Sequence, residues 1–434
     1  MLGDRPWVGA FMMGCFSTAA VALTFLLGRR FFGQAAGLWA AILLATNPWA
    51  VLYGRLALPE ADSTLLALLA IWVETRGGRP TARRALLVWI LSSLAMLANY
   101  RWLVLLPLFY LGLQLIAWRS GDRPGLRALL ARASLYLLGF VLPLLLTDFI
   151  YSAWILGPRL LEATRSRTYF EDLVWNIRKF SEQGWATGLR DPLRFPFFAL
   201  RFGGPVLLLG LLLGGWEAIR RARSADAECA RHARSVLLLA TAPPILLLFS
   251  VCGFPRCLSI ALAPWTILGG LWIEQAASRA PSRRLLLGAA VILPQLAMAP
   301  FVYLLHSGYA DAAAWLKARG DTHCLASQAY VLRVEGVNAI GIPSSEEKLR
   351  ELVALGYRYL VVDNQVWTGG QGAVYRRLAT HLTPVIEIPH SAGGSATFSY
   401  ESPERSLAAT FAREGGVDWF RPSVIRIYDL GAGR

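Results

Sequence analysis

Five charged side chains stand in the short gaps between long apolar segments, and their types suit a transfer reaction. They are Arg55, Glu60, Asp62, Arg101 and Arg256. The planar fork of an arginine can donate two hydrogen bonds to a phosphate and keeps its charge at any relevant pH. A carboxylate can take the proton of an attacking nucleophile. Together they favour a reaction in which a phosphate departs and an acceptor loses a proton.

The composition indicates contact with lipid. The chain is 55% hydrophobic and 16% charged, whereas soluble proteins carry about 45–50% apolar and about 25% charged residues. The net charge of +15 would suit nucleic acid if the basic residues gathered on one face. They stand instead in short segments between apolar runs, which is typical of membrane topology. We therefore expect a lipid bilayer as a partner and no nucleic acid.

About ten segments are long and apolar enough to span a bilayer as helices, which satisfy their own backbone hydrogen bonds. This pattern predicts an α-helical polytopic membrane bundle that positions the charged residues at helix ends. The expected spans are 8–28, 34–53, 60–75, 84–99, 102–118, 133–154, 199–217, 235–252, 258–274 and 285–305.

The arginines between these segments predict the orientation. Loops on one side carry eighteen arginines, and the short loops on the other side carry only Arg55, Arg101 and Arg256. Basic residues in short loops stay in the cytoplasm, so these three arginines, with Glu60 and Asp62, are expected outside. The longer outer loop 155–198 has mixed charge. We expect a multi-pass protein of the cell inner (plasma) membrane.

The composition changes after the last apolar segment. The chain is therefore expected to divide into a transmembrane domain, 1–305, and a C-terminal extracytoplasmic α/β domain, 306–434. No GxGxxG or P-loop pattern occurs there, so nucleotide binding is not supported. The expected helices are 309–319 and 345–355, and the expected strands are 323–327, 357–363, 384–388 and 423–428.

Cysteine and histidine give no metal-binding pattern. The five cysteines form no CxxC pair, and no histidine cluster accompanies them. The residues therefore identify no metal site and no certain cofactor, while a divalent cation is left open.

Several stretches resemble the GT-C class of membrane glycosyltransferases, which includes the protein O-mannosyltransferases and the bacterial aminoarabinose transferases. Residues 28–69 resemble the family's second and third spans, where an arginine is followed five residues on by an acid, here Arg55 and Glu60. The Asn-Tyr-Arg sequence that ends at Arg101 also fits. FPRCLSIALAPWTILGG, with Arg256 and Pro264, is similar to the start of a late span. The tail segments AAAWLKARG and GYRYLVVD look like the tails of bacterial members.

The resemblance implies a hexosyl- or pentosyltransferase of the cell envelope. Its donor would be a polyprenyl-phosphate-linked sugar, and its acceptor an extracytoplasmic lipid, glycan or protein. Carried over, the catalytic carboxylates are Glu60 and Asp62, and the donor-phosphate ligands are Arg55, Arg101 and Arg256. The family's catalytic aspartate lies in its first outer loop. We expect this chain to lack that loop and the first span.

Other interpretations of the same residues stay open. Arg55 and Glu60 could pair with each other, and Asp62 could serve only the helix start, where acids are favoured. Arg101 and Arg256 could extend to the interface as membrane arginines commonly do. A non-catalytic relative that binds lipid-linked sugar or acts as a scaffold is the alternative function. A transporter or flippase is a further one, although no repeated halves are evident.

Overall fold

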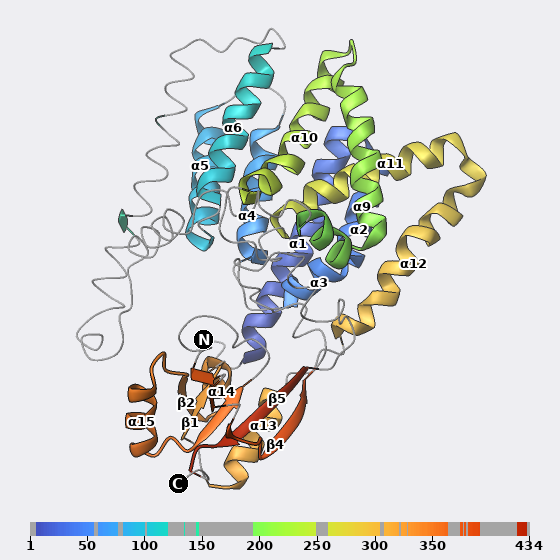
Figure 1. Ribbon diagram of the computed structural model, residues 1–434. Coiled ribbons are helices and arrows are strands. Elements are labelled where there is room, and N and C mark those ends of the chain that lie inside the picture. The colour runs from blue at the N-terminus through green and yellow to red at the C-terminus, as the bar shows by residue number, and fades with distance from the viewer. Residues whose placement is uncertain are drawn as a thin grey trace. The chain divides into compact units, whose positions relative to one another are not determined.

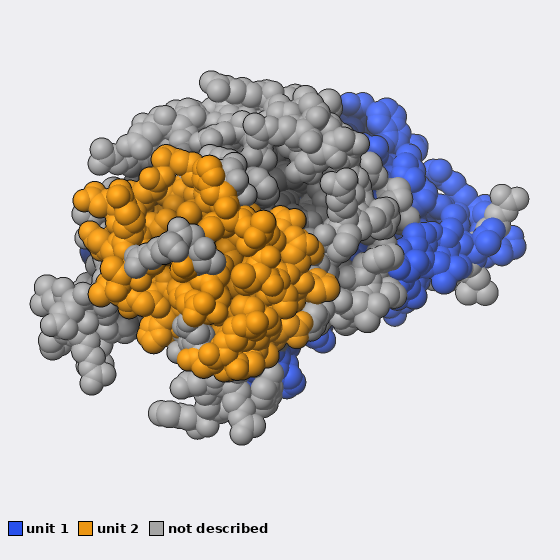
Figure 2. Space-filling view, turned by 60° about the horizontal axis from the view of Figure 1, so that its bottom comes forward, with its two compact units in different colours: residues 1–299 blue, residues 300–434 orange. Residues whose placement is uncertain are grey.

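The computed structural model divides into two compact units, Met1–Ala299 and Pro300–Arg434, coloured blue and orange in Figure 2. The boundary between the units falls inside a helix, and the predicted domain boundary at residue 305 stays a prediction. The structure describes residues 6–55, 60–76, 81–99, 102–119, 194–248, 259–303, 308–320, 323–327, 329–362, 381–390 and 423–431, with the short pieces 134, 145–146, 374–375 and 377–378.

The described part of the first unit is built from helices (Figure 1). A short 3₁₀ turn, Pro281–Arg283, precedes the last of them. The helices are α1 (Pro6–Phe32), α2 (Gln34–Thr46), α3 (Pro48–Arg55), α4 (Glu60–Glu74), α5 (Ala82–Ala98), α6 (Trp102–Arg119), α9 (Arg194–Ala222), α10 (Ala227–Leu248), α11 (Leu262–Arg279) and α12 (Arg284–Tyr303).

Each expected span within the described residues coincides with helix, because long apolar runs favour internally bonded backbone. The expected span 133–154 lies outside the described residues apart from isolated positions. Most of the outer loop 155–198 also lies outside them, but α9 begins at Arg194, before the predicted loop end. Non-helical angles at Gly204, φ 75° and ψ 164°, kink α9.

Within the described residues, one helical segment, Phe11–Phe32, is long and apolar enough by itself to cross a membrane. Shorter apolar helical segments cover Gln34–Thr46, Leu105–Ile116 and Leu286–Ala297. The count of about ten spans therefore stays a prediction.

The expected span 34–53 is wrong as a single helix, because it breaks at Asn47. Proline disfavours helical angles at the residue before it, and Asn47 is extended, with φ −68° and ψ 120°. Its buried side-chain oxygen accepts the backbone N–H of Trp49 at 3.0 Å and of Ala50 at 3.1 Å. Asn47 thus caps α3, which Pro48 begins.

We expect Asn47→Ala to destabilise the protein by about 1–2 kcal/mol, because it removes a buried cap. Thermal unfolding of the purified protein in detergent measures the loss. Thr81→Ala is the matched control, since Thr81 caps α5 from an exposed position by accepting the N–H of Arg84 at 3.3 Å. An equal or smaller effect at Asn47 would contradict the importance of the buried cap.

Small residues bring the helices of the first unit close together. Helix α11 packs against both α2 and α9. A Cβ atom on Gly270 would lie 2.8 Å from the backbone nitrogen of Ala40 in α2. One on Gly214 of α9 would overlap the carbonyl group of Leu268 in α11. Inside a membrane the hydrophobic effect does not drive helices together, and close van der Waals contact of this kind is a main source of their association.

The second unit contains one mixed sheet beside short helices. The strand order is β2-β1-β3-β5-β4. Strand β1 pairs in parallel with β2 and β3, whereas β5 pairs antiparallel with β3 and β4. The strands are β1 (His323–Ala326), β2 (Asn338–Gly341), β3 (Tyr359–Val362), β4 (Ile386–His390) and β5 (Ser423–Asp429), and the helices are α13 (Tyr309–Ala318), α14 (Ala329–Val334) and α15 (Glu346–Ala354).

Core clusters cover both faces of the middle of this sheet, where successive strand residues point to opposite sides. On the outer strand β4, Glu387 is exposed. Cys324 belongs to a core cluster with Leu316 of α13. The next residue, Leu325, belongs to a second cluster with Leu349 of α15. The expected small C-terminal α/β fold is thus confirmed, although β2 and α14 were not foreseen from the sequence.

Candidate functional site

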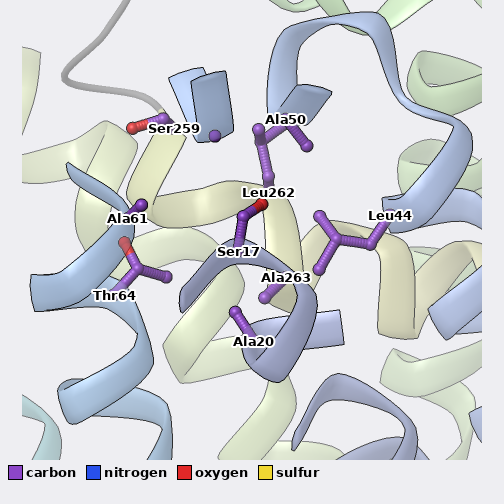
Figure 3. Close-up of a pocket in the computed structure, with 10 residues that line it drawn as sticks. Ser17, Ala20, Leu44, Ala50, Ala61, Thr64, Ser259, Leu262 and Ala263 are labelled. Atoms are coloured by element: carbon purple, nitrogen blue, oxygen red, sulfur yellow. The ribbon is translucent and has the colours of Figure 1, made fainter. Parts of the chain in front are cut away.

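A pocket opens in the first unit where several helices meet (Figure 3). It encloses about 450 Å³, part of which is open to solvent. Small apolar side chains make most of its wall, and the hydroxyls of Ser17, Thr64 and Ser259 add polar groups. The lining residues are Ser17 and Ala20 of α1, Leu44 of α2, Ala50 and Gly54 of α3, Ala61 and Thr64 of α4, and Ser259, Leu262 and Ala263 at the start of α11.

This pocket lies beside three of the segments that carry the predicted site residues. Gly54 directly precedes Arg55, the last residue of α3, and Ala61 directly follows Glu60, the first residue of α4. Ser259 follows Arg256 by three positions, although Arg256 itself lies outside the described residues. The fold therefore brings together chain segments that are about 200 residues apart. Whether these side chains act in the pocket stays a prediction.

Asp62 has the geometry of a helix-start residue. It stands in the first turn of α4 and is half-buried. One of its carboxylate oxygens accepts the backbone N–H of Ser63 at 2.7 Å. This contact supports a structural role at the helix N-terminus, where acids are favoured. The predicted catalytic role of Asp62 stays a prediction.

Solved structures resemble this arrangement over most of the chain. The oligosaccharyltransferase of Archaeoglobus fulgidus matches with a TM-score of 0.56 and 16% identity, over 86% of this chain and 58% of that one. ArnT from Cupriavidus metallidurans, bound to undecaprenyl phosphate, matches with a TM-score of 0.56 and 14% identity, over 98% of this chain and 84% of that one. The fold is of the GT-C class.

The likeness is one of fold and not of close sequence. No protein-family model matches the chain, and no curated protein matches it. The chain spans 58% of the oligosaccharyltransferase chain to which it is similar. The GT-C fold expected from the sequence motifs is therefore confirmed, and the activity is argued from the site.

Arg101 lies outside the described residues, after α5 and directly before α6 in the sequence. The N–H of Trp102 donates to the carbonyl of Asn99 at 3.1 Å, and both of these residues are buried. Among the described residues, those that line the pocket include none from α5 or α6. A role for Arg101 at the donor phosphate stays a prediction without support from the described lining.

Sequence reasoning missed the hydroxyls of the pocket. Ser17 and Thr64 lie within apolar runs, where a single small polar residue gives little signal. Thr64 lies in α4, four positions after Glu60 in the sequence. Ser17 lies against α3, since a Cβ atom on Gly54 would be 2.6 Å from the Ser17 hydroxyl. Gly54 therefore sets how closely the end of α3, and with it Arg55, approaches α1.

The described side chains do not form a metal centre. Among the described residues, no group of three or more His, Cys, Asp or Glu side chains could hold a metal ion. The acids nearest the pocket in sequence, Glu60 and Asp62, come from one helix turn. The described residues form a small cavity that contains hydroxyl groups. The chain segments that border it carry arginines and carboxylates.

Proposed function

We propose that the chain is an integral-membrane glycosyltransferase. It moves a sugar from a polyprenyl-phosphate-linked donor to an extracytoplasmic acceptor, which is a lipid, a glycan or a protein. The carrying observation is the pocket at which the end of α3, the start of α4 and the start of α11 meet. Arg55 ends α3 and Glu60 begins α4. Arg256 precedes the lining residue Ser259 by three positions in the sequence. The neighbours add support, since ArnT is bound to undecaprenyl phosphate and the archaeal oligosaccharyltransferase to dolichol phosphate.

In this proposal the acceptor hydroxyl attacks the anomeric carbon of the donor sugar. The bond between that carbon and the phosphate oxygen breaks, and polyprenyl phosphate leaves with the bonding electrons. The acceptor proton passes to a carboxylate, for which Glu60 is the preferred residue with Asp62 as its neighbour. Arg55, Arg101 and Arg256 stabilise the charge that develops on the departing phosphate. In the family that the chain resembles, the catalytic aspartate lies in a first outer loop, which this chain is expected to lack.

Exposed apolar faces support the membrane placement. On α5 the exposed side chains include Leu86, Leu87, Ile90 and Leu94, while Val88 and Ala95 on the opposite side are buried. Helix α12 likewise exposes Leu286, Leu293 and Leu296, and α9 exposes Leu209, Leu212, Leu213 and Trp216. Helices that are apolar on both the packed and the outer face are typical of a lipid environment. We propose the predicted multi-pass topology in the plasma membrane, with residues 306–434 outside.

A transfer assay in membranes tests this function. Membranes that contain the chain, and others that contain a version extended to any in-frame upstream start, are incubated with a panel of radiolabelled polyprenyl-phosphate sugars. We expect label to move to an acceptor and to be lost with Arg256→Ala, by about 10²-fold or more if the arginine stabilises the leaving phosphate. Chelator and added Mg²⁺ in parallel reactions test metal dependence.

If neither the chain nor its extended version transfers label, although both are present as folded protein in normal amounts, the proposal that the chain is a glycosyltransferase is refuted. Retained binding of the lipid-linked sugar would then identify a non-catalytic relative. Movement of the intact donor across the bilayer without transfer would identify a flippase.

A further inference from the structure

Four arginines from different helices come together away from the residues that line the pocket. Arg30 is in the last turn of α1, and Arg76 lies two residues after the end of α4. Arg84 is in the first turn of α5, and Arg231 is near the start of α10. The positive charges of Arg84, Arg76 and Arg231 all act on Arg30. We call these four residues the arginine cluster.

Contacts with neighbouring residues fix the helix ends that carry these arginines. The guanidinium of Arg84 donates to the backbone carbonyl of Glu74 at the end of α4. Arg76 lies over the ring of Trp72, 3.8 Å from its centroid. The rings of Phe31 and His232, the neighbours of Arg30 and Arg231, meet edge to face with centroids 5.5 Å apart. The packing of the helices therefore brings four positive charges together from parts of the chain that are far apart in sequence.

Carboxylates compensate this charge only in part. Glu228 attracts Arg30 but is 71% exposed and lies 3.9 Å from His232. Asp226 caps α10 by accepting the N–H of Glu228 at 2.9 Å. Glu217 is already engaged by Arg220, Arg221 and Gln275. With Glu74 included, basic groups still outnumber acids at these helix ends.

Arg30 has a buried hydrogen-bond donor. The Nε atom of Arg30 is buried, and no hydrogen-bond acceptor for it occurs among the described residues. A buried N–H that loses water without gaining an acceptor is unfavourable. A phosphate oxygen would supply that acceptor, and the phosphate would offset part of the positive charge of the cluster.

We propose that the arginine cluster binds the phosphate group of an anionic membrane phospholipid. The exposed Leu86 and Leu87 follow Arg84 on α5, so an apolar surface for acyl chains begins beside the charges. Basic pockets between membrane helices at the cytoplasmic face favour such headgroups. The proposal uses the membrane placement proposed above but none of the pocket residues. It adds a second phosphate site, on the side where the arginine-rich loops predict the cytoplasm.

Thermal unfolding of the full chain in detergent tests the lipid site. We expect dioleoylphosphatidylglycerol to raise Tm in a saturable way, and the zwitterionic dioleoylphosphatidylcholine to have little effect. Arg30→Gln should weaken the apparent affinity for the anionic lipid by about tenfold or more, because a charged hydrogen bond is lost. Arg29→Gln is the matched control, since Arg29 is the exposed neighbour with the same charge and should keep an affinity within about twofold.

Equal loss in the Arg29 and Arg30 variants would show diffuse attraction and would overturn the site. If inorganic phosphate at the same concentration raises Tm as much as the anionic lipid does, the cluster binds a free anion, and the proposal of a lipid site is overturned. If Arg30→Gln fails to fold, Arg231→Gln is used, with the same tenfold loss expected. The rise in Tm with lipid is measured without sugar transfer. A negative result for the lipid site therefore does not count against the proposed glycosyltransferase activity, and a negative transfer assay does not count against the lipid site.

Discussion

Replacing Glu60 with glutamine lowers kcat for sugar transfer by about 10²- to 10⁴-fold if its carboxylate receives the acceptor proton. The amide keeps the size of the side chain but cannot take up a proton at neutral pH. Glu60 is the first residue of α4, and the next residue lines the pocket. Initial rates with saturating donor and acceptor measure the loss. KM for the donor should change little, because the substitution leaves the arginines in place.

Glu74→Gln is the matched control for this result. Glu74 ends the same helix, so the substitution makes the same chemical change at the opposite end of α4. It should leave kcat within about threefold of the parent chain, because surface substitutions away from the reaction have small effects. A Glu60→Gln protein with unchanged Tm and nearly full activity would exclude the carboxylate from catalysis. It would leave Glu60 only the structural roles of pairing with Arg55 or beginning a helix.

Replacing Gly214 with alanine destabilises the protein by about 3 kcal/mol, the upper part of the range for overpacked sites. The new methyl group would overlap the carbonyl of Leu268 in α11. Backbone atoms cannot rotate away as a flexible side chain can. Helix α9 must therefore move from α11, which also contributes Leu262 and Ala263 to the pocket. Thermal unfolding in detergent measures the loss.

Gly215→Ala, one residue further along α9, provides the control. No heavy atom lies within 4 Å of a Cβ atom built there. The same substitution should therefore be neutral or stabilise the helix by about 0.5–1 kcal/mol, because alanine favours helix over glycine. Similar Tm values for the two variants would mean that the close contact between α9 and α11 does not support the fold.

The positions of most helices could be predicted from the sequence. In lipid, a single long apolar segment can form all its backbone hydrogen bonds within itself only as a helix. The break at Asn47 could also have been inferred, since proline restricts the residue before it and asparagine is a common cap. Hydropathy averages over both residues and hides the break. Strand β2 was missed because it has only four residues, which begin shortly after Gly336 and end at Gly341, and because its pairing with β1 stabilises it.

The sequence by itself determined which residue types could do chemistry, the GT-C motifs and the uneven distribution of arginine. These are properties of composition and short spacing, and they need no knowledge of long-range contacts. Only the tertiary structure decided that Gly54, Ala61 and Ser259 line one pocket and that Arg30 lies near Arg231. Those residues are brought together by helix packing at glycines such as Gly214 and Gly270. Such packing depends on the fit of two surfaces, which no pattern within a single segment encodes.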